Sequence, residues 1–191
     1  MNKLSVLISI AFSALSACTY NVKPSIPALP IEKLASTPID CSVLLLMPQE
    51  FSNKEFVSSF ENHEVHVSVG APAAKAVENL VRAQYSHVEI VAVAGDGTLD
   101  FIKYANNVQS KPSLVIRPRF QRLDSSVRLF KYNFEFVIST DIAGLSSPIT
   151  PSGMGVGTAG LYTESVIQKA VSEALSNSAN ALASELPKTC K

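Results

Sequence analysis

The chain has 191 residues, of which 47% are hydrophobic, and it carries 16 basic and 16 acidic side chains. This balance of charge argues against a nucleic-acid partner and against attachment to anionic lipid by charge alone. The hydrophobic content excludes a disordered chain, and the length predicts a single globular domain.

The first 17 residues have the composition of an export signal. Met1-Asn2-Lys3 is a short cationic start, Leu4 to Phe12 is apolar, and Ser13 to Ala17 supplies small residues before Cys18. The apolar run is shorter than the roughly 20 residues that cross a bilayer. Leu15-Ser16-Ala17-Cys18 resembles the lipobox of bacterial lipoproteins, in which the cysteine is acylated and becomes the new N-terminus. The alternative is an ordinary secretory signal that happens to contain a cysteine.

The resemblance implies a lipid anchor of palmitate type on Cys18. Two or more acyl chains hold a protein stably at a membrane, whereas one does so only marginally. Thr19 stands where, in many Gram-negative lipoproteins, an aspartate would retain the protein at the inner membrane. The expected location is therefore the outer membrane, facing the periplasm.

The remaining two cysteines, Cys41 and Cys190, form a candidate pair in an oxidising compartment. We predict a disulfide between them, and two free thiols are the alternative. The sequence has no Cys-x-x-Cys or Cys/His pattern typical of a metal site, and we expect neither a metal nor a cofactor.

Composition divides the chain into three parts: the signal peptide (1–17), the lipidated cysteine with a proline-rich segment (18–40), and one domain (41–191). Four prolines in the second part disfavour helix and sheet, so we predict an extended tether. At roughly 3.1 Å per residue such a tether would reach about 60 to 70 Å.

The domain shows a sequence of strands and helices. Ser42 to Met47 is a continuous apolar run, which predicts a strand buried on both faces. Further strands are predicted over 63–69, 87–94, 113–123 and 132–140, and amphipathic helices over 72–86 and 163–186. The segment 50–62 fits either a short helix or a loop. This order predicts an α+β fold, with a mixed or antiparallel sheet of about five strands and two main helices on one face.

Two glycine-rich motifs have a nucleotide-site interpretation. Gly95-Asp96-Gly97-Thr98 resembles the nucleotide loop of diacylglycerol-kinase-like enzymes, but it stands alone, so we interpret it as a turn. Residues 155–160 match GxGxxG, yet the dinucleotide fingerprint needs a following strand with an acid. We interpret 146–160 as a flexible loop or a segment that contacts a partner. His63 and His66 fall on opposite faces of a predicted strand, which disfavours a metal pair.

The strands 113–123 and 132–140 form a predicted antiparallel pair. Pro118 stands within the first strand, which suits an edge or a bulge. Alternation on the second strand predicts that four side chains point inward: Tyr132, Phe134, Phe136 and Ile138.

The same strand pair is the most basic part of the chain. Arg117, Arg119 and Arg122 belong to it, and Glu135 is a possible cross-strand partner. One interpretation is a solvated sheet face. The other is a surface that binds phosphate-bearing lipid headgroups or an acidic partner.

The element order, together with the lipobox and the proline-rich segment, resembles small lipoproteins of lipopolysaccharide assembly and transport-auxiliary systems. The resemblance implies a non-enzymatic, membrane-anchored envelope protein that binds a protein partner as an accessory to outer-membrane assembly or transport. A periplasmic lipid or glycolipid carrier is the main alternative, and a hydrolase is a third. Against an enzyme, no catalytic constellation assembles from three histidines and scattered acids.

Overall fold

The computed structural model describes residues 18–28, 34, 37–60, 63–106, 113–128, 131–145, 147–160 and 163–190. The strands are β1 (Cys18–Val22), β2 (Ile39–Pro48), β3 (Glu55–Phe60), β4 (His63–Ser68), β5 (Tyr85–Val93), β6 (Leu114–Arg128), β7 (Lys131–Ala143) and β8 (Ser152–Ala159). The helices are α2 (Gln49–Ser52), α3 (Gly70–Gln84), α4 (Thr98–Ala105) and α5 (Glu164–Glu185).

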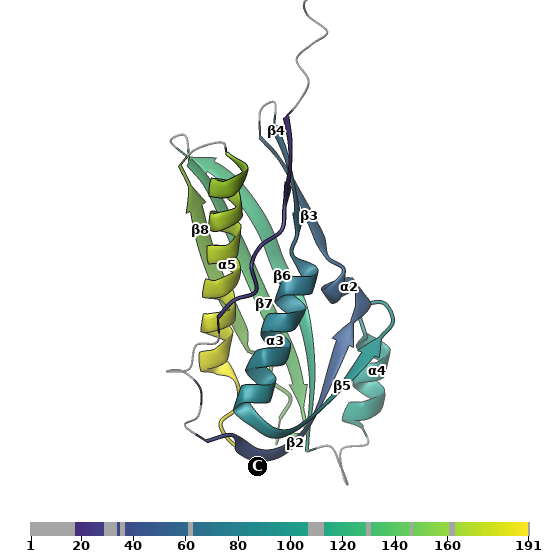
Figure 1. The fold of residues 1–191 in the computed structure, drawn as a ribbon. Helices are drawn as coiled ribbons and strands as arrows, with labels where there is room; N and C mark the ends of the chain where they lie inside the picture. Colours follow the sequence, from purple (N-terminus) through teal and green to yellow (C-terminus); the bar gives the residue numbers. More distant parts are fainter. Residues whose placement is uncertain are drawn as a thin grey trace, which may run out of the picture.

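The predicted α+β class is confirmed, with α3 and α5 as the two long helices on one side of a five-stranded sheet (Figure 1). That sheet has the order β5-β2-β6-β7-β8, in which β5, β2 and β6 are parallel and β6, β7 and β8 are antiparallel. A smaller sheet of order β1-β4-β3 lies beside it. The sequence did not predict this second sheet.

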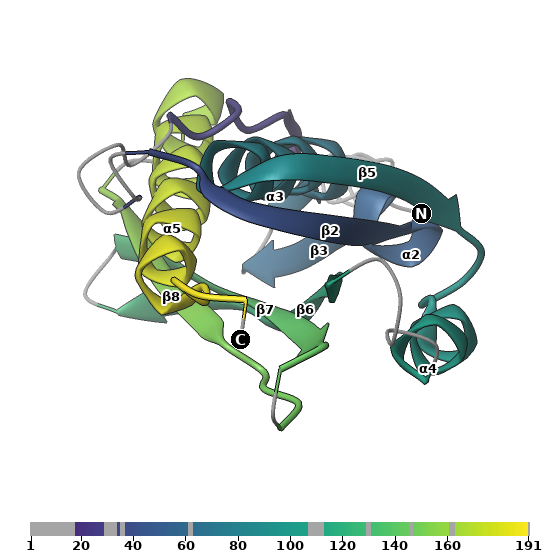
Figure 2. The same ribbon diagram turned by 90° about the horizontal axis from the view of Figure 1, so that it is seen from below.

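Strand β2 lies between β5 and β6 and is buried on both faces, as its continuous apolar run predicts. Val43 and Leu45 point into the main core with α3 and α5. Leu44 and Leu46 point to the other face, where the partly buried rings of α4 cover them. Figure 2 shows α4 on that opposite side, apart from the two long helices. The sequence pattern does not predict α4 as a helix.

The long antiparallel pair β6–β7 follows the predicted alternation. The side chains expected to point inward on β7 are all at most 1% exposed: Tyr132, Phe134, Phe136 and Ile138. The hairpin is longer than predicted, since β6 continues to Arg128 and β7 begins at Lys131. The pairing register shifts between Phe120 and Arg122, close to the proline at position 118 that the sequence assigned to an edge or bulge.

The interpretation of residues 146–160 as a flexible loop is wrong, because 152–159 form strand β8. Its glycines alternate and face α5, while Met154 and Val156 point outward. A Cβ on Gly157 would lie 1.8 Å from the carbonyl oxygen of Ala170, and one on Gly155 would lie 2.0 Å from that of Ala174. The glycines therefore let the helix rest on the strand backbone, which is a packing role and not a nucleotide-binding one.

The N-terminal segment also differs from the prediction. Instead of a tether free of the domain, residues 18–22 form β1, which pairs in parallel with β4. The chain then runs between α3 and α5 in Figure 1, and the Gln168 side-chain amide donates to the Lys23 carbonyl at 2.9 Å. Val22 is 1% exposed. Burial of Val22, Pro24 and Pro27 on the domain explains why residues 18–28 do not extend into solvent.

The predicted disulfide between Cys41 and Cys190 is present, with a Cα–Cα distance of 6.2 Å. It ties the segment after α5 to the first half of β2. A second link lies close by, since the Tyr85 hydroxyl donates to the Pro187 carbonyl at 2.8 Å. Burial raises the pKa of the Tyr85 hydroxyl.

Candidate functional site

A crevice lies where the parallel strands β2 and β5 reach their carboxyl ends. In open α/β sheets, ligands bind at this kind of edge. Pro48 ends β2 and leads into α2, whose Glu50 amide donates to the Gly95 carbonyl after β5 at 3.0 Å. The crevice has a volume of about 240 Å³. Its lining residues are Pro48, Glu50, Phe51, Lys54, Asp96, Pro118, Arg119 and Phe120.

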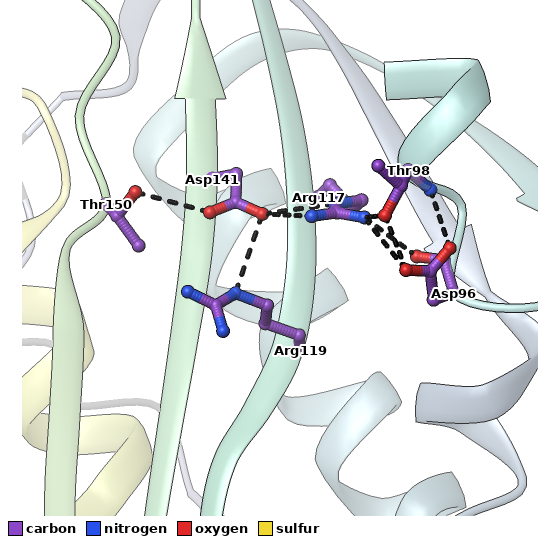
Figure 3. A network of polar contacts seen from close by, with 6 residues as sticks. All are labelled: Asp96, Thr98, Arg117, Arg119, Asp141 and Thr150. Atoms are coloured by element: carbon purple, nitrogen blue, oxygen red, sulfur yellow. Dashed lines mark hydrogen bonds and ion pairs between the residues drawn. The ribbon is translucent and has the colours of Figure 1, made fainter. Parts of the chain in front are cut away.

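Arg117 is the centre of a polar network beside this crevice (Figure 3). Its guanidinium contacts Asp141 at 2.5 Å, donates to the Asp96 carbonyl at 3.2 Å, and also bonds the Thr98 hydroxyl. It lies over the ring of Phe101, 5.5 Å from the centroid. The Arg117 side chain is only 11% exposed. These contacts make Arg117 a structural link that holds α4 to the sheet, and not a residue available to a ligand.

The Gly95-Asp96-Gly97-Thr98 segment forms the turn between β5 and α4, as predicted. Gly97 has φ of 70°, a conformation that favours glycine. The Asp96 carboxylate accepts from the Thr98 amide at 2.9 Å and from the Thr98 hydroxyl. These bonds from Thr98, and then the charge of Arg117, lower the pKa of Asp96. The chain's own Asp96 carboxylate therefore occupies the Thr98 amide at the start of α4.

Arg119 and Arg122 are the two arginines of the predicted surface that solvent reaches. Arg119 is 46% exposed, and its Nε lies 3.6 Å from the Asp141 carboxylate. Arg122 is 60% exposed and contacts Glu135 at 2.7 Å. The latter contact is the cross-strand pair that the sequence suggested. The three arginines therefore do not form one surface: Arg117 is internal, while the other two line neighbouring crevices.

A second crevice of about 320 Å³ continues from the first and shares Lys54 and Phe120 with it. The full lining of the second crevice is Lys54, Glu55, Phe56, Val57, Phe120, Gln121, Arg122 and Leu123. We call the two together the β3–β6 groove. One wall is the start of β3 with the residues before it, and the other is the middle of β6.

The β3–β6 groove lies between two strand edges. Strand β3 is an edge strand of its sheet, and β6 pairs with β2 only over residues 114–116. Over the rest of β6, no strand of the described chain pairs with the edge that faces β3. The two edges approach at one end, where the hydroxyls of Ser58 and Ser125 are 2.5 Å apart. Toward the start of β3 the two strand edges separate, and the crevices open between them.

Sequence reasoning missed Glu50, Lys54 and Asp96 as neighbours in this site. The sequence does contain a pattern that points to one edge of this site. Pro48 and Gly95 each follow an apolar strand segment, and the carboxyl ends of parallel strands meet at one edge. The parallel pairing of β2 and β5 could not be read from the pattern, because their connection includes a hairpin, β3–β4, as well as a helix.

The other predicted site residues lie elsewhere. The backbone of Cys18 begins β1, beside His63 of β4. His66 contacts Glu64 at 3.3 Å on the small sheet. Among the described residues, no three His, Cys, Asp or Glu side chains gather closely enough to hold a metal ion. None of the described helices is long and apolar enough to cross a membrane.

The chain matches no protein-family model and no curated protein sequence. Three solved structures show a distant likeness. The hypothetical protein CT253 from Chlamydia trachomatis has a TM-score of 0.44 at 3% identity, over 76% of this chain and 95% of that one. Lipoprotein GNA1162 from Neisseria meningitidis has a TM-score of 0.39 at 11% identity, over 69% and 93%. The PelC dodecamer from Paraburkholderia phytofirmans has 0.34 at 12%, over 77% and 95%. At these values the likenesses carry no argument about function.

Proposed function

We propose that this chain is a non-enzymatic lipoprotein of the bacterial envelope, anchored through Cys18 in the outer membrane and facing the periplasm. In this proposal it binds a protein partner as an accessory to outer-membrane assembly or transport. The lipobox Leu15-Ser16-Ala17-Cys18 supports the anchor. The Cys41–Cys190 disulfide supports an oxidising compartment.

The observation that carries the binding role is the β3–β6 groove. Two strand edges face one another without a strand between them in the described chain, and both present backbone donors and acceptors. An extended segment of a partner can add to such an edge through main-chain hydrogen bonds, while side-chain pockets select its sequence. The partly buried Phe56, Phe120 and Leu123 supply apolar contacts at the groove.

The charges at the groove favour a partner segment of mixed composition. Lys54, Arg119 and Arg122 lie along it, and Glu50, Glu55 and Asp96 balance them. Because three cations and three carboxylates balance along it, the groove offers no net attraction to a strongly acidic or phosphate-bearing ligand. This balance favours a polypeptide segment over a lipid headgroup at the groove.

The test is site-specific photo-crosslinking in bacterial cells that produce the lipidated chain. A photoreactive amino acid replaces Val57 on one wall or Arg122 on the other, which are 48% and 60% exposed. Met154, 59% exposed on the outer face of β8, is the matched control. We expect the same protein adduct from both walls and none from position 154.

Adducts from position 154 equal to those from the groove would contradict the proposed binding site. Phospholipid adducts from positions 57 and 122, without a protein adduct, would contradict partner binding and favour the carrier alternative. Mass spectrometry of the excised adduct identifies the crosslinked species in each case.

A further inference from the structure

Strand β1 begins at Cys18, the residue that the lipobox assigns to the anchor. Its pairing with β4 starts there too, because Cys18 lies beside His63 and Val22 lies beside Val67 in a parallel register. Val22 and Val67 are buried, at 1% and 0% exposed. No free linker therefore separates Cys18 from the folded domain.

The residues that follow β1 are held against α5. The Ser25 amide donates to the Ser172 hydroxyl at 3.0 Å, and the Lys23 carbonyl accepts from Gln168 at 2.9 Å. Pro24 and Pro27 are buried. The chain thus leaves Cys18 and runs back along the domain, toward the end where the disulfide lies (Figure 1).

Cys18 shares its end of the molecule with three other chain segments. The Phe60 ring, at the end of β3, contacts Tyr132 at the start of β7 with centroids 4.2 Å apart. Tyr132 in turn lies opposite Ala159, the last residue of β8. We call this the anchor end, comprising Cys18, Phe60, His63, Arg128, Lys131 and Gly160.

Two exposed basic side chains mark the anchor end. Arg128 and Lys131 face one another as the last described pair of the β6–β7 hairpin. Cationic side chains close to a bilayer surface are attracted by headgroup phosphates. Their position at the same end of the molecule as the start of β1 makes this end chemically suited to a phospholipid surface (Figure 1).

We infer that the anchor end lies directly against the phospholipid bilayer and that the domain stands off the membrane along its strands. This inference rests on the proposed acylation of Cys18. Acyl chains attached to a residue inside a hydrogen-bonded strand pin that end to the surface. The 13 residues of β7 span roughly 40 Å, so the opposite end of the sheet stands about that far from the lipid.

The experiment compares two labelled positions on the full lipidated protein in vesicles of phosphatidylethanolamine and phosphatidylglycerol. A fluorophore is attached to Gly160→Cys at the anchor end or to Ser147→Cys after β7, with the native disulfide kept oxidised. Both residues are exposed, and no atom lies within 4 Å of a Cβ built on Gly160. Nitroxide-labelled headgroups quench a fluorophore that lies at the bilayer surface.

We expect strong quenching at position 160 and none at 147. A flexible Gly/Ser insertion between Cys18 and Thr19 serves as the control, and it should reduce quenching at 160 to the level at 147. If the mass of the protein shows the acyl chains, equal quenching at both positions, or no quenching at either, would overturn the orientation alone. A protein recovered without acyl chains would overturn the orientation and the proposed anchor together.

Discussion

The contact between α5 and the glycines of β8 gives the sharpest test of the fold. In Gly157→Ala, the added methyl group would lie 1.8 Å from the Ala170 carbonyl oxygen, about 1.6 Å short of the 3.4 Å at which ordinary contact begins. Backbone atoms cannot rotate away, so the helix must move from the sheet. Overpacking of this kind costs about 1–3 kcal/mol.

The change from glycine to alanine also stabilises the folded state, and this gain reduces the cost of the clash. Replacement of glycine by alanine restricts the unfolded chain and stabilises the folded one by about 0.4–1 kcal/mol when the site is unstrained. Gly160→Ala isolates this effect, since no atom lies within 4 Å of its added methyl. We therefore expect Gly157→Ala to lower the free energy of unfolding by about 1–2 kcal/mol, and Gly160→Ala to leave it unchanged or raise it slightly.

Urea unfolding followed by circular dichroism, with the disulfide oxidised, measures both variants. A second substitution, Gly155→Ala, should add less than its own cost to Gly157→Ala, because one displacement of α5 relieves both contacts. Equal stability of Gly157→Ala and Gly160→Ala would refute the close packing of helix on strand.

Three further predictions concern the links between elements. Replacing Cys41 and Cys190 by serine opens a link of 149 residues and should cost about 5 kcal/mol in the chain-entropy model, measured by urea unfolding; unchanged stability would refute it. Arg117→Ala removes the nearer of the two cations from the largely buried Asp141 carboxylate and should cost about 3 kcal/mol, and a loss no larger than that of Arg119→Ala would contradict its structural role. Thr98→Ala should raise the pKa of Asp96 toward its usual range, as measured by NMR titration. The stability linked to this group is present above its unfolded pKa and is lost as pH falls through the lowered folded pKa, so that loss should shrink in the variant; an unchanged pKa would contradict the assignment.

Sequence periodicity predicted the helices and strands whose buried face is marked by apolar residues at regular spacing. The amphipathic helix predicted over 72–86 is α3, and residues at helical spacing form its buried face: Ala73, Ala76, Val77, Leu80, Val81 and Gln84. The same holds for the inward side chains of β7 and for most of α5. In each case a repeat of 3.6 or 2 residues records which side of the element meets the core.

The pattern failed where burial depends on a neighbour that is distant in sequence. Strand β8 has glycine at three of its four inward positions and alanine at the fourth, so it shows no pattern of large apolar residues until α5 is placed upon it. The prolines of 18–40 predict a tether, whereas strand β1 depends on a partner, β4, that begins only at His63. Helix α4 buries none of its residues fully, and Leu99 is 83% exposed, so its hydrophobic pattern did not mark a core element.

For the candidate site, too, some features follow from the local sequence and others only from the tertiary structure. The sequence identified Arg117, Arg119 and Arg122 as a basic group, because residue type and strand period are local properties. Only the tertiary structure separated them, since Asp141, Asp96 and Thr98 reach Arg117 from two other elements. The lipobox-like motif, the cysteine pair and the α+β class follow from order along the chain. The β3–β6 groove and the position of Cys18 at one end of the domain depend on strand pairing between distant segments, which no local pattern specifies.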